Sequence, residues 1–498
     1  MSQLSEPTFP ARAAGSAPSP NARAARPGHW LWRLRWPLGA LGVLAVSAAV
    51  VAWARVRPGY DPYGWLTWGH LTLHGKLDTN GAPSWKPLPY LFTLPYALTG
   101  RDAVYLWMTT AFTISLSGLL FAWRVAYRLV APGPDRRWAG HLAGLTAAAA
   151  VIGIYSFPHS ILSAESDTMI VALCLAAADA ILCRRLRWAF WALWLAALGR
   201  PEAWSLLLLY GAWAFWTQPR MRWQVLLGIV LVPLLWFGVP ALSSKSPFTA
   251  ATLAENSHRA LHGNKLTGTI GRFLGLDAVP IKVAALLAVL LAIVRRDRAV
   301  LVLAGAVVVW VAVEIAFALH GYSAVPRYIY EAGAGTAVLA GVVVGRVIID
   351  VPAALGVARL RVPPVAAGLA VVVIMVAFAG SLVPVARSRL ASERGDLALQ
   401  RTRAVQVDQL EDAVRRIGGG RILRCGHPKV WISWQSVLAW DLGTNVGSLF
   451  FNPGYHRRHP HSIVNLYPHD YGWQIFGSDW TDADQAARCR RLRYKTGS

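Results

Sequence analysis

The sequence has few charged residues and few cysteines. Charged side chains make up only 15% of its 498 residues, whereas 55% are hydrophobic and the mean hydropathy is +0.40. This balance lies outside the range of soluble globular proteins, so membrane-spanning segments must absorb the apolar excess. The four cysteines show no C-x-x-C or similar spacing, which argues against a cysteine-ligated metal site.

Acidic residues are particularly scarce. Lys and Arg together number 49, against 25 for Asp and Glu, a bias expected when short cytoplasmic loops hold a membrane protein in orientation. The basic residues are scattered between apolar runs and do not form one stripe interleaved with aromatics, which a nucleic-acid surface would need. The lipid bilayer is therefore an expected partner, and nucleic acid is not.

The N-terminus lacks large apolar side chains. Residues 1–29 are mostly Ala, Pro, Ser and Arg, which predicts a disordered cytoplasmic segment over 1–36. The first apolar run begins only near Pro37, and no small-residue cleavage site follows it cleanly. We therefore interpret 37–54 as a retained span and not as a signal peptide.

The rest of the apolar sequence predicts an all-α polytopic protein of the plasma membrane. A hairpin of two short helices at 188–217 would bring every basic cluster to the cytoplasm and give about eleven membrane segments. Residues 188–199 would form a helix only about 18 Å long, so we expect Arg200 and Glu202 to lie below the membrane surface. The other predicted spans are 103–123, 140–157, 167–183, 224–242, 279–294, 299–319, 328–345 and 364–386.

This topology divides the chain into a transmembrane domain, 37–386, and an extracytoplasmic C-terminal domain, 387–498. The C-terminal domain mixes a helical stretch with short apolar runs and is predicted to be a small α/β fold. It holds Cys425 and Cys489, the only cysteines outside the spans. On the oxidising outer face these two are expected to form a disulfide, and two unpaired thiols are the alternative.

The outer loop 55–102 carries the most informative residues. Asp61 follows closely after a span, Lys86 lies among prolines, and aromatic residues that include Trp68 and Tyr90 are candidates for substrate contact. A carboxylate at the water–membrane boundary can accept a proton from an incoming hydroxyl. A nearby cation can stabilise a departing phosphate.

These residues resemble a known family. An acid, an Asn, the run Lys86-Pro87-x-Pro89-Tyr90 and then Tyr96-Ala97-Leu98-x-Gly100 are similar to the first periplasmic loop of the GT-C glycosyltransferases. Lipid A aminoarabinose transferases and protein O-mannosyltransferases have the nearest pattern. The resemblance implies that Asp61 is the catalytic base and that Lys86 contacts the donor phosphate. Many members have a second acid after the first, where this chain has Pro62, so the acceptor class does not carry over.

Weaker resemblance continues through the membrane region. Within Ser163-Ala164-Glu165-Ser166-Asp167, Asp167 best matches the second carboxylate of the family. Arg200-Pro201-Glu202 is similar to an element of actinobacterial-type members, and Arg327-Tyr328 to the Arg-Tyr that enters a late span. The resemblance therefore implies that Asp167 is a second catalytic residue and that Arg200, Glu202 and Arg327 bind substrate.

Each role has a structural alternative. Asp61 and Asp167 could be helix caps, Lys86 could reach toward lipid headgroups, and Arg200 with Glu202 could form a structural ion pair. Charges at membrane depth are costly, which favours function. No metal is assigned; a divalent cation at His70, His74 and Asp78 is the alternative, although their spacing is unspecific.

Together these features predict an inverting glycosyltransferase. It would move mannose, arabinose or a similar sugar from a polyprenyl-phosphate donor to a glycan, lipid or protein acceptor of the cell envelope. The alternative is a transporter or flippase of a lipid-linked sugar intermediate. Transporters usually show internal repeats and polar groups near the midplane. Here no repeat is detected and polar residues concentrate in an outer loop, which favours the enzyme.

Overall fold

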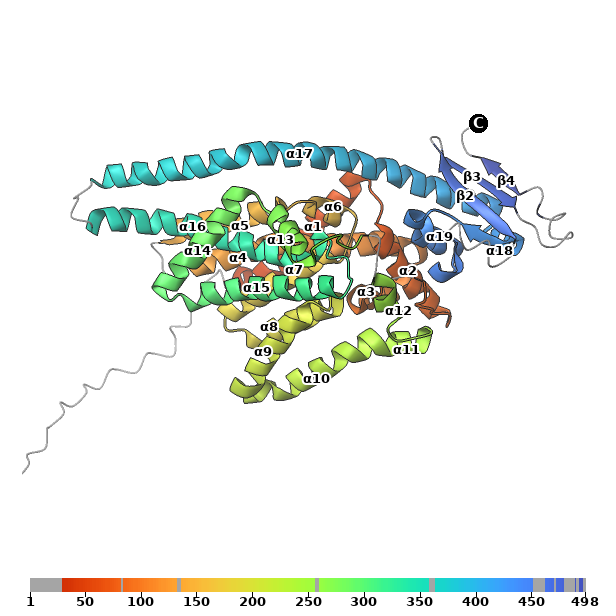
Figure 1. The fold of residues 1–498 in the computed structure, drawn as a ribbon, viewed down its shortest axis with the longest axis horizontal. Helices are drawn as coiled ribbons and strands as arrows, with labels where there is room; N and C mark the ends of the chain where they lie inside the picture. The colour runs from red at the N-terminus through yellow and green to blue at the C-terminus, as the bar shows by residue number, and fades with distance from the viewer. Residues whose placement is uncertain are drawn as a thin grey trace, which may run out of the picture.

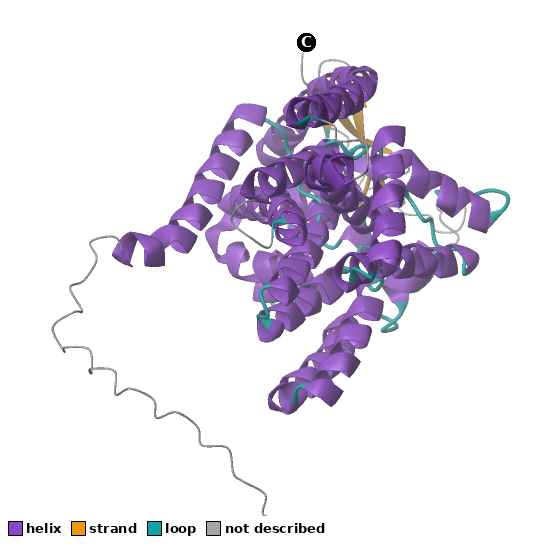
Figure 2. Cartoon of the chain, turned by 90° about the vertical axis from the view of Figure 1, so that its left-hand side faces the viewer, coloured by secondary structure: helices purple, strands orange, loops and turns teal. Residues whose placement is uncertain are grey.

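The computed structural model is a bundle of helices with a small sheet at one end (Figures 1 and 2). It describes residues 29–81, 84–131, 136–255, 259–357, 363–450, 462–469, 472–478, 489 and 492–495. Disorder was predicted over 1–36: residues 1–28 lie outside the described part of the chain, whereas 29–36 are helical. The first helix, α1 (His29–Ala54), begins ahead of the predicted span at Pro37.

A helix lies at each of the predicted spans. After α1 these helices are α4 (Ala103–Val130), α5 (Arg137–Ile152), α7 (Asp167–Leu182), α8 (Leu186–Gly199), α9 (Ala203–Thr217), α10 (Arg222–Pro233) continued by η4 (Leu234–Gly238) and α11 (Val239–Ser243), α14 (Val279–Arg295), α15 (Arg298–Leu319), α16 (Tyr330–Val357) and α17 (Pro364–Ile417).

Not all of these helices can cross a bilayer alone. Among the described residues, 6 helices are long and apolar enough, or 7 if the bent pair α13 (Lys265–Leu276) and α14 is one span. The hairpin helices α8 and α9 have 14 and 15 residues, fewer than the roughly 20 that a perpendicular span needs. The structure is therefore that of a helical membrane protein, and the count of eleven segments stays a prediction.

Small residues let the central helices approach closely. Gly341 and Gly345 of α16 face α5, where any added side chain would meet the backbone oxygens of Ala143 and Ala139. Ala147, one turn further along α5, also touches Gly341. This small-xxx-small spacing is how membrane helices pack without a hydrophobic driving force between them.

Two ion pairs join two of the basic clusters, the α14–α15 turn and the last part of α16, at one end of the bundle. Arg295 pairs with Asp350 at 2.6 Å, and Arg346 pairs with Asp297 at 3.0 Å. This end lies opposite the sheet in Figure 1. The arrangement agrees with the predicted grouping of the loops, whereas the side of the membrane on which they lie stays a prediction.

The C-terminal region begins on the second half of a long helix, α17 (Pro364–Ile417). α17 has 54 residues and runs without a break through position 387, where its composition changes from apolar to polar. Beyond it lie α18 (Gly419–Cys425) and α19 (Gln435–Leu442). A four-stranded sheet of order β1-β2-β3-β4 follows, made of β1 (His427–Lys429), β2 (Ile463–His469), β3 (Gly472–Ser478) and β4 (Arg493–Lys495).

Strands β1 and β2 are parallel, and the other two pairs are antiparallel. Trp473 of β3 donates to the carbonyl of Gln406 at 2.8 Å and so fixes the sheet to α17. This region is a small α/β unit with mixed strand directions.

The C-terminal region packs on the outer loop. Tyr60, next to Asp61, donates its hydroxyl hydrogen to Oε1 of Gln435 in α19 at 3.1 Å. Gly81, which has a positive φ of 82°, lies so close to Gly447 that a side chain there would collide with its backbone. The α/β unit therefore covers the segment that carries Asp61.

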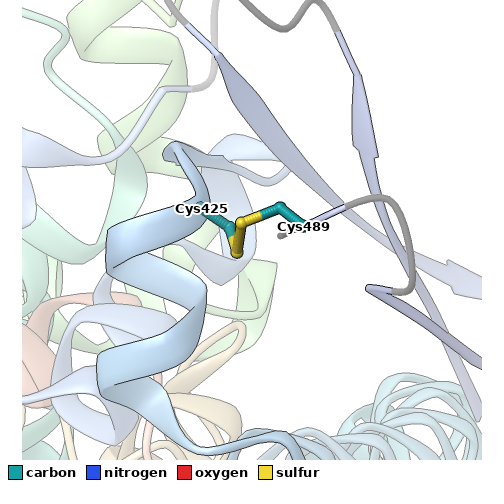
Figure 3. Close-up of a disulfide and its surroundings, with 2 residues drawn as sticks. All are labelled: Cys425 and Cys489. Carbon is teal, nitrogen blue, oxygen red and sulfur yellow. A yellow bond between two sulfur atoms is a disulfide. The ribbon is translucent and has the colours of Figure 1, made fainter. Parts of the chain in front are cut away.

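A disulfide joins Cys425 at the end of α18 to Cys489 (Figure 3), with the Cα atoms 5.6 Å apart. A bridge across a loop of this size contributes roughly 4 kcal/mol in the chain-entropy model. We expect denatured, unreduced protein to show two reactive thiols, those of Cys174 and Cys183. A count of four by a thiol reagent would exclude the bridge, and reduction beforehand supplies the four-thiol control.

Candidate active site

Three cations of the site lie beside prolines at the start of a helix or in the turn between two helices. Lys86 precedes α3 (Pro87–Tyr96) with an extended backbone, φ −146° and ψ 124°. Arg200 is extended as well, φ −151° and ψ 136°, at the break between α8 and α9. Both precede a proline, which disfavours helical geometry in the residue before it. Arg327 follows Pro326 in the short helix η5 (Pro326–Ile329).

Arg327 is the centre of a cluster of carboxylates. Its guanidinium lies 3.0 Å from Oδ2 of Asp61, 3.4 Å from Oε2 of Glu165 and 3.8 Å from Oδ2 of Asp167. Asp61 is in the first turn of α2 (Tyr60–Leu73), and the N-cap of that helix is Gly59. The Asp61 side chain therefore contacts Arg327 and does not cap its helix.

Asp167 is the most enclosed member of the cluster, with a side chain that is 0% exposed. Its Oδ1 accepts a hydrogen bond from Arg200 and lies 3.5 Å from Nζ of Lys86. Lys86 also donates to Oγ of Ser166 at 2.9 Å and lies over the ring of Trp65. The Lys86 ammonium thus points into the cluster.

Arg200 links this cluster to the α8–α9 break. Its side chain is 4% exposed and binds Glu202 through two nitrogens, at 2.8 and 3.2 Å. Its guanidinium also lies 3.7 Å from the ring centroid of Tyr328. Arg200 is thus enclosed by protein and paired with carboxylates, as a buried charge requires.

Sequence reasoning overlooked Glu165. This residue lies in the turn before α7, and both Asp61 and Arg327 face its carboxyl group. Burial, together with the negative charge of Asp61, raises the pKa of Glu165 to about 8. Glu165 is therefore largely protonated at neutral pH, and three cations then face three carboxylates: Asp61, Asp167 and Glu202.

Two predicted substrate-binding residues, Trp68 and Tyr90, contribute to packing within the outer loop. Trp68 donates its indole hydrogen to the carbonyl of Asp78 at 3.1 Å, and its ring meets Trp85 edge-on. The hydroxyl of Tyr90 is 2.8 Å from that of Thr72. The Tyr90 contact joins α2 to α3, and the Trp68 contacts join α2 to the segment before α3. Both side chains therefore pack within the outer loop, and their part in substrate binding stays a prediction.

The alternative metal site also differs from its prediction. His74 bonds through Nδ1 to the carbonyl of His70, and Asp78 accepts two hydrogen bonds from Asn80. Over the described residues, no three His, Cys, Asp or Glu side chains are grouped to hold a metal ion. Among the described residues, the cluster around Arg327 thus offers carboxylates and cations but no grouped metal ligands.

The comparison with known proteins gives a structural likeness. No family model and no curated protein matches the chain. ArnT from Cupriavidus metallidurans bound to undecaprenyl phosphate matches with a TM-score of 0.50 and 15% identity, over 88% of this chain and 94% of that one. The apo state of the same ArnT gives a TM-score of 0.47 at 16% identity. The chain therefore shares the overall fold of a solved ArnT structure.

Proposed function

We propose that this protein is a GT-C membrane glycosyltransferase that uses a polyprenyl-phosphate sugar as donor. The observation that carries the proposal is the contact of Asp61 with Arg327 in a cluster that also holds Lys86 and Arg200. A base and several cations are what transfer from a phosphate leaving group requires. The ArnT neighbour is bound to undecaprenyl phosphate, which supports a lipid of this class as the donor carrier.

In the proposed reaction an acceptor hydroxyl attacks the anomeric carbon of the donor sugar. The bond between that carbon and the phosphate oxygen breaks, and the lipid phosphate leaves with both bonding electrons. Asp61 takes the hydroxyl proton, while Lys86 and Arg327 stabilise the phosphate charge. Attack opposite the leaving group inverts the anomeric configuration. The sugar is mannose, arabinose or a similar one, and the acceptor is a cell-envelope glycan, lipid or protein.

The direct test incubates purified protein with a panel of polyprenyl-phosphate sugars and an envelope extract as acceptor. Consumption of one donor, with release of polyprenyl phosphate, is the expected result. Liposomes that contain the protein and a labelled lipid-linked sugar test the alternative. Movement of the lipid between leaflets without sugar release would identify a flippase and overturn the proposal.

Lys86→Ala is expected to weaken donor binding and slow the leaving-group step together, because the ammonium would be lost from the phosphate site. The measurement is KM for the donor and kcat, each compared with wild type. Lys76→Ala is the matched control, since Lys76 is an exposed lysine of the same outer loop. A change confined to acceptor affinity would assign Lys86 to the other substrate.

Donor affinity is expected to fall as the pH rises through about 8. Below this pH Glu165 is neutral because its pKa is raised to about 8; above it, a further carboxylate faces Arg327 and repels the donor phosphate. Two like charges about 4 Å apart repel by about 1 kcal/mol even in water, so the expected loss of donor affinity is about fivefold or more. Glu165→Gln cannot ionise, so its donor KM should stay flat from pH 7 to 9. An unchanged profile in this variant would show that another group titrates.

A further inference from the structure

A groove lies where the end of α1 meets α17. Its volume is about 410 Å³, and it is lined by Ala52, Trp53, Arg55 and Arg401. This volume is within the roughly 300–1,000 Å³ of small-molecule sites. Arg401 joins the two walls: it donates to the carbonyls of Ala54 at 2.8 Å and Trp53 at 3.2 Å, and its guanidinium lies over the Trp53 ring.

The α17 wall continues as a stripe of arginines. Arg387, Arg394 and Arg401 are spaced by seven residues, just under two helical turns, so they project from one face. Arg387, Arg394 and Arg55 are exposed. In the part of the chain that the structure describes, these three form no hydrogen bond or ion pair with protein. Their charges are therefore available to a ligand.

The same face of α17 changes character along its length. Val376 and Val383 are exposed on the membrane side of the arginine stripe, and Asp412 lies on this face beyond it. The opposite face contacts the bundle, for example through Asp396, which binds His159 at 2.9 Å. A surface that passes from apolar to basic to acidic places its arginines at the headgroup layer of a bilayer.

We propose that this groove binds the headgroup of an anionic phospholipid. Arg55, Arg394 and Arg401 would contact the phosphate, which their charge complements. The acyl chains would follow α1, where Trp53 is 63% and Val46 56% exposed and the two are seven residues apart on one face. A soluble phosphate has no apolar group that could contact these side chains of α1. The site shares no residue with the cluster around Arg327, so it is additional to the donor site.

Such a lipid would hold the C-terminal region at the membrane. It would bridge α1 and α17 at the level where Arg403 also donates to the carbonyl of Pro58 at 2.8 Å, close to the start of α2. Each arginine near an anionic membrane surface contributes a factor of about five in affinity. Loss of two of them should thus weaken binding by roughly thirtyfold.

The test titrates the full-length protein in neutral detergent with phosphatidylglycerol or phosphatidylcholine and counts bound lipid by native mass spectrometry. Phosphatidylglycerol is expected to bind at least about fivefold more tightly. Arg394→Gln should weaken this binding about fivefold, and the double variant Arg55→Gln/Arg394→Gln about thirtyfold. Arg416→Gln is the matched control: it removes an exposed arginine of the same helix, about 33 Å beyond Arg394.

Three results would overturn the proposal. Equal affinity for the two lipids would show that the negative charge of the headgroup does not determine binding. Equal losses in Arg394→Gln and Arg416→Gln would show that only net charge counts. Complete displacement of phosphatidylglycerol by millimolar inorganic phosphate would identify a site for free phosphate and not for a lipid. Sugar transfer by the same variants is assayed in parallel. Loss of lipid binding with sugar transfer retained, or the reverse, then shows that the lipid site and the proposed enzyme activity stand or fall independently.

Discussion

Asp61→Asn is expected to lower turnover by about two to four orders of magnitude, the range for removal of a general base. The amide has the shape of the carboxylate, but it cannot accept the proton of an attacking hydroxyl. Arg327 lies 3.0 Å from Asp61 Oδ2, and an amide oxygen can still accept that hydrogen bond. The variant should therefore keep its thermal midpoint near the wild-type value and bind donor.

Asp102→Asn is the matched control, since Asp102 is an exposed acid in the same outer segment. It should retain wild-type turnover. If Asp61→Asn also transfers sugar at a near-normal rate, Asp61 is not the base. A large loss of stability in Asp61→Asn would instead indicate a structural role, because the activity loss would then follow from unfolding.

Arg200→Gln is expected to lower the free energy of unfolding by about 3–5 kcal/mol, the usual cost of removing one partner from a buried ion pair. The variant leaves Asp167 and Glu202 without their closest cation, and their side chains are 0% and 5% exposed. Thermal unfolding in detergent, followed by intrinsic tryptophan fluorescence, would measure the loss.

The double variant Arg200→Gln/Glu202→Gln separates a structural pair from a substrate ligand. If Arg200 acts mainly as a structural partner, neutralising Glu202 should recover much of the lost stability. Arg187→Gln, an exposed arginine at the start of the same hairpin, should change stability little. If Arg200→Gln loses donor binding while its free energy of unfolding stays at the wild-type value, the prediction is wrong and Arg200 is a substrate ligand.

The positions of the helices could be predicted because apolar runs and basic clusters depend on local composition. The α8–α9 hairpin was predicted from the same pattern, and the structure places the buried Arg200 and Glu202 at its turn. The predicted domain boundary at 387 is not a break in the structure. Apolar residues give way to polar ones there, yet no proline follows before Gly418, so the helix continues.

The partners within the site could not be predicted in the same way. Asp61 and Arg327 are 266 residues apart, and sequence shows only that each charge needs a partner. Glu165 lies two residues before Asp167 and was overlooked because no local pattern distinguishes their surroundings. The part that Trp68 and Tyr90 play in substrate binding stays a prediction for a related reason: an aromatic residue in a loop can pack, bind or do both, and its presence in the sequence does not distinguish these cases.

The unbroken α17 has a consequence for how the length of this protein can vary. One added residue in its middle would rotate everything beyond it by about 100° and shift it by 1.5 Å. The helix is fixed at both ends of its polar part, by Asp396 to His159 and by Asp408 to Arg57 at 2.6 Å. A seven-residue insertion would nearly restore the angle but displace the α/β unit by about 10 Å, away from Tyr60. Insertions and deletions should therefore be confined to the loops around this helix. The number of residues in α17 sets the distance between its apolar part and the segment that carries Asp61.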